Sequence, residues 1–455
     1  MHVRTLKWLV VLIASTTIAL VTAPAATAAS PAPADPAGSV LAWNAYAGQA
    51  ALDACLAPGN NPLHESRLYA VTHIAIHDAL NAIDRRSGPY VFKARRLVPG
   101  ASADAAVAAA AHKVLVTLIG QLPDPPSVPA CKEAAISGVE AAFAVQMAMV
   151  EDGDAKAQGT HLGEAAAAAI LALRTGDGST TPLFDTEFEQ GDSPGEYRFT
   201  PGFDFVLAPG WADVTPFALE RNDQFPSHPP YPLTSPQYAA DLEEVKQVGQ
   251  DTSTERTDDQ TELAQFWYES SPLQWNRIAR TVAGSTPRLS EWGTARLFGL
   301  LNMAMADGYI ASWETKRVHN TWRPITAIRA ADTDGNRATK VDPTWSPLLT
   351  TPPVSALNSG HSVEGAAAAE VMKQFFGTDH RSFTTCSLTV PEGTGCGSGS
   401  DEVVRSFTSF AQAADENAAS RIYDGIHFRQ DVEEGLRQGR SIGDHAVDQE
   451  MVPGR

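Results

Sequence analysis

The sequence predicts an all-α fold made of helical bundles. Apolar residues recur at spacings of three and four along Val40–Leu173 and again along much of 236–442, as expected of helices with one buried face. Alternation of the kind that marks strands is rare, and no unit repeats with a fixed period. The chain of 455 residues is long enough to bury a large core.

The first residues have the composition of an export signal. Basic residues precede an apolar run, Trp8–Val21, and a small-residue site, Ala26–Ala28, follows it. The run is shorter than the ~20 residues that a membrane-spanning helix needs, and we expect no later stretch to span. We therefore expect a secreted, extracellular protein with a signal peptide, residues 1–28, that is cleaved after Ala28, and a disordered Pro/Ala linker, residues 29–39.

After the linker, the pattern predicts an N-terminal helical region, residues 40–235, and a C-terminal helical region, residues 236–455. The predicted helices cover residues 67–84, 101–122, 132–150, 163–174, 236–248, 258–269, 291–318, 361–376, 403–415 and 431–442. Between the two regions, residues 175–235 are rich in Gly, Pro and aromatic residues. This segment is too long for an ordinary connection, and its aromatic residues predict an ordered loop that packs on the protein.

Four cysteines follow the signal peptide, and an exported protein is expected to pair them as disulfides. None forms a C-x-x-C pair, so a zinc knuckle is not expected. Three pairings are possible. Because Cys386 and Cys396 flank a short Thr/Gly/Pro-rich loop, we predict the pairs Cys386–Cys396 and Cys55–Cys131.

The formal net charge is −19. So acidic a chain lacks the basic face that nucleic-acid binding requires, and it gains nothing from an anionic membrane surface. An anion would have to be bound by a few focused basic residues.

Three polar clusters in the C-terminal region could do this. In the first, Lys316 and Arg323 lie seven residues apart, so they would share a helix face if the helix ran through, although Pro324 disfavours helical geometry at Arg323. Two cations on one face can bind an oxyanion, with Arg supplying a bidentate fork. The alternative is a solvated basic patch.

The second cluster, Ser359-Gly360-His361, opens a predicted helix. Free backbone N–H groups and the helix dipole make such a terminus an anion site, and glycine lets a ligand approach the backbone. His361 projects from the first turn. The alternative is an ordinary serine N-cap beside an exposed histidine.

The third cluster holds Arg421, His427 and Asp431. His427 and Asp431 are four residues apart, so on one helix face the carboxylate would accept a hydrogen bond from one ring nitrogen and leave the other as a ligand or nucleophile. Asp424-Gly425 should end the preceding helix and let Arg421 turn toward His427. The alternative is a surface His–Asp pair. Together the three clusters describe a site for a tetrahedral or trigonal-bipyramidal oxyanion.

The motifs K-x6-RP, SGH and SR-x5-H-x3-D resemble the signature of the vanadium-dependent haloperoxidases. Type 2 phosphatidic acid phosphatases and bacterial non-specific acid phosphatases share this signature. The flanking segments KRVHNTWRPITAIR, RIYDGIHF and RLYAVTHIAIHDALNAIDR are more similar to the soluble haloperoxidase branch. The resemblance implies an all-α fold of two four-helix bundles, with the catalytic site in residues 236–455.

The resemblance also implies a role for each motif residue. The residues that would bind vanadate or phosphate are Lys316, Arg323, Ser359, Gly360 and Arg421. His427 would be the vanadium ligand or a phosphorylated nucleophile, Asp431 would orient it, and His361 would be the acid–base group. Two residues could line the pocket, Trp313 and His319.

The sequence departs from the family around the second motif. Asn358 stands where the family usually has proline, which should loosen the turn. The stretch before it, Pro353–Leu357, lacks the aromatic residue of fungal chloroperoxidases, and Ser362–Ala368 lacks the second histidine of algal bromoperoxidases. The residues expected to form a halide pocket therefore match those of the fungal and algal enzymes poorly.

Three functions follow as hypotheses. The first is a haloperoxidase with a vanadate cofactor that oxidises halide with hydrogen peroxide. The second is a secreted acid phosphatase that hydrolyses phosphate monoesters through phospho-His427 and needs no cofactor. The third is a non-catalytic oxyanion-binding protein, for which His361 and the His427–Asp431 pair would be superfluous.

Other motifs predict no further site. His73 and His77 have the spacing of a zinc pair but lack the glutamate of HExxH, so a packing role is expected. The glycine-rich stretch Gly393–Gly399 follows no predicted strand, and no G-x-S-x-G motif is present.

Overall fold

The computed structural model describes residues 38–122 and 130–454. The predicted signal peptide and nearly all of the predicted linker therefore lie outside the described residues. The last residue of the predicted linker, Ser39, is described, and it begins the first helix, α1 (Ser39–Asp53).

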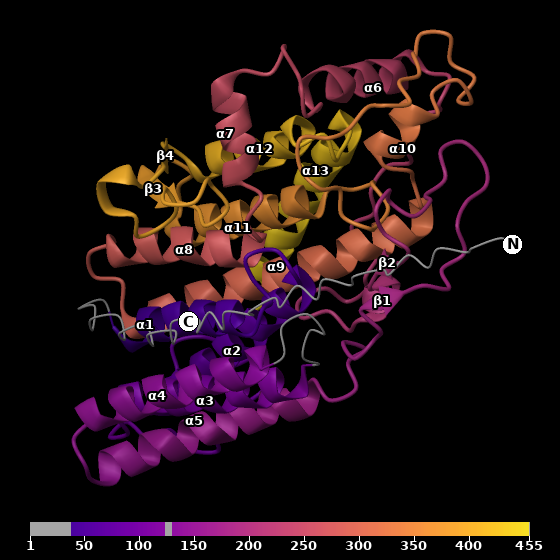
Figure 1. The fold of residues 1–455 in the computed structure, drawn as a ribbon. Coiled ribbons are helices and arrows are strands. Elements are labelled where there is room, and N and C mark those ends of the chain that lie inside the picture. Colours follow the sequence, from indigo (N-terminus) through magenta and orange to yellow (C-terminus); the bar gives the residue numbers. More distant parts are fainter. Residues whose placement is uncertain (1–37, 123–129, 455) are drawn as a thin grey trace, which may run out of the picture. The chain divides into compact units, whose positions relative to one another are not determined.

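The first bundle consists of four helices (Figure 1): α2 (Pro62–Ile83), α3 (Ala103–Gln121), α4 (Cys131–Met149) and α5 (Asp154–Leu173). Asn61 and Ser102 cap α2 and α3 with their side chains, and Pro62 occupies the first position of α2. Close packing of α5 on α3 depends on a glycine, because a Cβ at Gly163 would lie 2.2 Å from the Ala106 carbonyl oxygen. The helices expected over 67–84, 101–122, 132–150 and 163–174 are confirmed.

The second bundle consists of α9 (Glu291–His319), α11 (Gly360–Phe376), α12 (Phe410–Tyr423) and α13 (Arg429–Gln449). Helix α13 lies directly on α11, since a Cβ at Gly439 would lie 2.0 Å from the Val363 carbonyl oxygen. Helix α9 also packs against α2, and one continuous apolar core runs through both bundles. Helices α1 and α8 (Ser271–Gly284) pack where the bundles meet (Figure 1). The all-α prediction is confirmed.

Two predictions about elements of the second region were wrong or incomplete. The helix expected over 403–415 begins only at Phe410, because Val404–Phe407 forms β4, which pairs antiparallel with β3 (Phe383–Cys386). The rings of Phe383 and Phe407, directly opposite each other, lie 5.4 Å apart and stabilise this hairpin. Helix α8 and the short α10 (Pro324–Arg329) were not predicted, whereas α6 (Pro236–Val248) and α7 (Asp258–Phe266) were.

The segment 175–235 is an ordered loop, as predicted. It contains β1 (Phe184–Asp185), β2 (Val206–Leu207) and a 3₁₀ turn, η1 (Pro209–Asp213). The Asp307 carboxylate of α9 accepts three consecutive backbone N–H groups of the loop, at 2.6 to 2.9 Å. These bonds, and the burial of Trp211, fix the loop to the second bundle.

Among the described residues, α3 is long and apolar enough to cross a membrane by length and composition alone. This corrects the expectation that no stretch after the signal peptide would qualify. The structure buries 61% of its apolar window, because α3 packs between the other helices of the first bundle.

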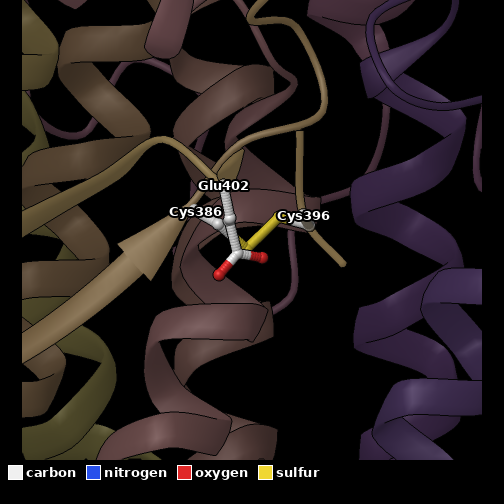
Figure 2. A group of neighbouring side chains, drawn as sticks. All are labelled: Cys386, Cys396 and Glu402. Carbon is white, nitrogen blue, oxygen red and sulfur yellow. A yellow bond between two sulfur atoms is a disulfide. The ribbon is translucent and has the colours of Figure 1, made fainter. Parts of the chain in front are cut away.

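Both predicted disulfides are present, Cys55–Cys131 and Cys386–Cys396. Figure 2 shows the Cys386–Cys396 disulfide beside the carboxylate of Glu402. The sulfur and carboxylate oxygen atoms of these three residues lie close enough together to be considered as a metal site. Disulfide sulfurs are not thiolate ligands, and Glu402 accepts the Gly397 backbone N–H at 2.6 Å. The disulfide and the Glu402 hydrogen bond therefore hold the loop closed, and the three side chains do not form a metal site.

Candidate active site

The three predicted clusters meet at helix ends of the second bundle. They come from the last turn of α9, the start of α10, the first turn of α11, the last turn of α12, and the segment that leads into α13. Helix ends carry backbone groups without helical partners, so a polar site is expected there.

Lys316 is 4% exposed and faces the chain just before α11. Its ammonium group donates to the carbonyl oxygens of Ser355 (2.8 Å), Ala356 (3.1 Å) and Asn358. Burial, and then the neighbouring Arg323 charge, lowers the pKa of Lys316 well below its usual range. Lys316 thus fixes the approach of the chain to the SGH motif.

Arg323 does not continue the helix of Lys316. Helix α9 ends at His319, Asn320 takes a left-handed conformation, and Arg323 is extended before Pro324, so the shared helix face considered from the spacing does not form. The Arg323 guanidinium is nevertheless buried in the site. It donates to the Val354 carbonyl at 2.6 Å, to the Ile426 carbonyl at 2.8 Å and to Nε2 of His427 at 2.9 Å.

His427 and Asp431 form the expected pair, with Nδ1 and Oδ2 3.1 Å apart. They do not share a helix face, because His427 precedes α13 and only Asp431 lies in its first turn. Asp431 Oδ2 also accepts the Phe428 N–H at 3.0 Å, which ties the carboxylate to the helix start. The Asp431 carboxylate therefore bridges the His427 imidazole and the backbone at the start of α13.

The imidazole of His427 is neutral. Burial, and then the charges of Arg323, Lys316 and Arg421, lower its pKa well below its usual range. With Nδ1–H donated to Asp431, Nε2 carries the lone pair, and this lone pair accepts from Arg323. The tautomer follows from these hydrogen bonds, and it leaves Nε2 as the nitrogen able to act as ligand or nucleophile.

Arg421 reaches the site from α12, which ends at Tyr423 before Asp424-Gly425 as predicted. One guanidinium nitrogen lies 2.8 Å from Asp424 Oδ2, and the guanidinium carbon is 5.6 Å from the centre of the Tyr268 ring. The Nε atom is buried and has no acceptor among the described residues. Sequence reasoning assigned Asp424 only to helix termination and missed this ion pair, which its i,i+3 spacing from Arg421 could have indicated.

At the start of α11, Ser359 is the N-cap and accepts the Ser362 N–H at 3.3 Å. The backbone N–H groups of Gly360 and His361 find no acceptor in the described part of the chain. The Ser359 N–H donates to the Asp431 carbonyl at 3.0 Å, which joins the second cluster to the third. This terminus therefore has free donors beside buried cations.

His361 is half-buried, and its Nε2 lies 3.2 Å from the Glu269 carbonyl oxygen. Burial, and then the Arg421 charge, lowers the pKa of His361 well below its usual range. Arg421 and His361 also act on the charge state of His427, so both histidines belong to one electrostatic environment.

Asn358 does not loosen the turn before α11, contrary to expectation. Its side chain is fully buried and accepts from Ser312 at 2.8 Å. It donates to Ser227 at 2.9 Å and to Gln438 at 2.8 Å. Asn358 thus ties the motif to α9, to the long loop and to α13.

The two expected lining residues lie in different places. The Trp313 ring is 3.8 Å from where a Gly360 Cβ would be, and β2 covers it through a bond from Nε1 to the Leu207 carbonyl at 3.3 Å. His319 instead lines a separate cavity of about 290 Å³ that reaches the site only at Asp431. His73 and His77 bond to different partners, Asn44 and Ser87, as packing residues do.

The charges of the site are unbalanced in favour of an anion. Two buried guanidinium groups, Arg323 and Arg421, and the buried amine of Lys316 face two buried acids, Asp424 and Asp431. Burial raises the pKa of each acid to about 7, so neither is fully ionised at neutral pH. The unpaired Arg421 Nε and the free amides of α11 add donors without acceptors, and an oxyanion would satisfy them.

Fold and site thus define an all-helical, two-bundle protein with a buried cluster of basic side chains and unpaired donors at the helix ends of its second bundle. Residues 296–452 match the family described as the VCPO second helical-bundle domain. The vanadium chloroperoxidase of Curvularia inaequalis is 26% identical over 231 residues, which cover 40% of this chain and 37% of that protein. Residues 296–452 and the overall fold are thus similar to those of the vanadium haloperoxidases.

Two solved structures have a fold similar to that of this chain. A bacterial vanadium-dependent iodoperoxidase has a TM-score of 0.73 at 25% identity, covering 92% of this chain and 97% of that chain. The apo form of a bacterial vanadium-dependent chloroperoxidase has a TM-score of 0.67 at 16% identity, covering 86% and 94% of the two chains. At this lower identity, the likeness supports the fold.

Proposed function

We propose that this protein is a secreted vanadium-dependent haloperoxidase, which oxidises halide with hydrogen peroxide at vanadate bound by His427. The observation that carries the proposal is a neutral His427 whose Nε2 lone pair faces a buried cluster of cations. The bacterial iodoperoxidase and chloroperoxidases of similar fold support it.

The residues present fit vanadate. His427 Nε2 would bind the vanadium, and Arg323, which now donates to that atom, would turn its donors to the oxyanion. Arg421, through its unpaired Nε, and the Gly360 amide would bind the remaining oxygens. Bound vanadate supplies an electrophilic centre that activates hydrogen peroxide for two-electron oxidation of halide.

The chain itself supplies orientation and proton handling. Asp431 holds Nδ1–H of His427, which keeps the lone pair on Nε2. His361, neutral and at the start of α11, can take a proton from peroxide and return it to the leaving oxygen. Trp313 and the β2 segment exclude water from one wall of the site.

The test uses metal-free protein with and without added vanadate. Oxidation of iodide, bromide and chloride by hydrogen peroxide is measured beside hydrolysis of p-nitrophenyl phosphate. We expect halide oxidation that requires vanadate and is lost in His427→Ala. His228→Ala is the matched control, because the His228 side chain is exposed and its ring pairs with Glu434 rather than with a proposed site residue. Hydrolysis that vanadate abolishes, without halide oxidation, would favour the phosphatase instead. Vanadate binding without either activity would favour a binding protein.

A further inference from the structure

Beside the oxyanion site lies the cavity of about 290 Å³ that His319 and Asp431 border. It is formed by α6, the start of α13, the segment after α9 and the end of the long loop. Four aromatic side chains line it, from residues Tyr231, Tyr238, Trp322 and Phe428. The rings of Tyr238 and Phe428 lie 6.1 Å apart and are inclined by 49°, so these two walls meet at an angle.

Two acids line this cavity, Asp431, which is bonded to His427, and Asp241 of α6. Asp241 forms no ion pair with any described residue, and its Oδ2 accepts one backbone bond, from the Gln430 N–H at 2.9 Å. Arg429, whose charge acts on Asp241, is already paired with Glu244. Burial raises the pKa of Asp241 to about 6. Because Arg429 is paired with Glu244, the Asp241 carboxylate has no ion-pair partner among the described residues.

Gln430 holds the walls of the cavity in place. Its side chain accepts the Tyr231 N–H at 2.8 Å and donates to the Pro229 carbonyl at 2.8 Å. Its own backbone N–H binds Asp241. The long loop, α6 and α13 are thus connected through one residue, so the cavity is organised before any ligand binds.

We propose that this cavity binds a small organic cation, with an ammonium group held between the aromatic walls and the Asp241 carboxylate. Aromatic faces attract cations through the ring quadrupole, most strongly when the cation is desolvated. The acid supplies the opposite charge that four neutral rings lack. A volume of about 290 Å³ suits a molecule the size of choline. The net charge of −19 favours the approach of cations from solution.

The test is isothermal titration calorimetry of the full chain with choline and with 3,3-dimethylbutan-1-ol, which has the same shape without the charge. We expect saturable binding of one choline per chain, and binding of the alcohol at least about ten-fold weaker. Vanadate is left out, so the result is independent of the proposed oxidation chemistry.

Two variants separate charge from aromatic packing. Asp241→Asn should weaken choline binding by about ten-fold or more, because the amide keeps an oxygen for the Gln430 N–H but loses the charge. Tyr231→Leu, at a half-buried wall residue, should weaken choline binding by about five-fold and change alcohol binding little. Glu243→Gln is the matched control, since Glu243 is an exposed acid of the same helix bonded to Gln247.

Three results would overturn the proposal: no saturable choline binding up to about 10 mM, equal affinity for the alcohol, or an equal loss in Asp241→Asn and Glu243→Gln. If Asp241→Asn does not fold, judged by circular dichroism, the Tyr231→Leu variant and the alcohol comparison still decide. Unchanged choline affinity in Tyr231→Leu would then exclude an aromatic cation site.

Discussion

Replacement of Asp431 by asparagine tests how the site orients its histidine. The carboxylate accepts Nδ1–H of His427 at 3.1 Å and the Phe428 N–H at 3.0 Å. Asparagine retains one oxygen, which can serve the Phe428 amide, and turns an NH₂ group toward the imidazole. The ring proton would then move to Nε2, and the lone pair proposed to bind vanadate would be lost.

Loss of such a supporting partner lowers metal affinity by about 10- to 100-fold, or about 1.4–2.7 kcal/mol. Stability should change in the opposite direction. Burial raises the pKa of Asp431 to about 7, so the native state loses stability as pH rises from about 4 toward 7. The asparagine variant lacks this loss, and relative to wild type it should gain up to about 4 kcal/mol between pH 4 and pH 8.

The assay pairs vanadate titration at pH 8, followed by calorimetry, with urea unfolding at pH 5 and pH 8. Glu433→Gln, an exposed acid two residues further along α13, is the control and should match wild type in both measurements. Vanadate affinity within two-fold of wild type in Asp431→Asn would refute the orienting role. Reduced affinity together with reduced stability at pH 8 would show damage to the fold instead.

Three further changes test a buried acid, a buried amide and a disulfide. Burial raises the pKa of Glu65 to about 8, so wild-type stability should fall between pH 5 and pH 9 by up to about 5 kcal/mol; Glu65→Gln should remove this fall in urea unfolding, and an unchanged pH profile would contradict the buried acid. Asn358→Ala strands three buried partners and should cost about 2–4 kcal/mol in the same assay, whereas a cost under about 0.5 kcal/mol would show that these bonds are replaced by water. Thiol titration of the unfolded, unreduced protein should find no free thiols, and replacing Cys55 and Cys131 by serine should cost about 4.5 kcal/mol because the disulfide closes a separation of 76 residues. Free thiols in the untreated protein would contradict this pairing.

Signals within a few residues of a helix end made some helices of this protein predictable. The bounds predicted for α6 match the structure because Ser235 caps it and Pro236 fills its first position, signals that lie within the helix end itself. The short disulfide was predictable for the same reason, since Cys386 and Cys396 flank one loop. Helix α8 was missed although Trp275, Ile278 and Val282 keep the spacing of three and four residues, so its signal was present in the sequence.

By itself, the sequence determined which groups would form the oxyanion site, because three motifs of cations, a helix start and a His–Asp pair point to one chemistry. Only the tertiary structure decided how these groups contact one another. Arg323 meets His427 across 104 residues of chain, and Lys316 is held by carbonyls about 40 residues further on. The pairing of Arg421 with Asp424 and the fixing of Asn358 were decided in the same way. Side-chain periodicity reports which face of an element is buried, whereas contacts between helix ends depend on how separate elements pack, and no local pattern encodes that.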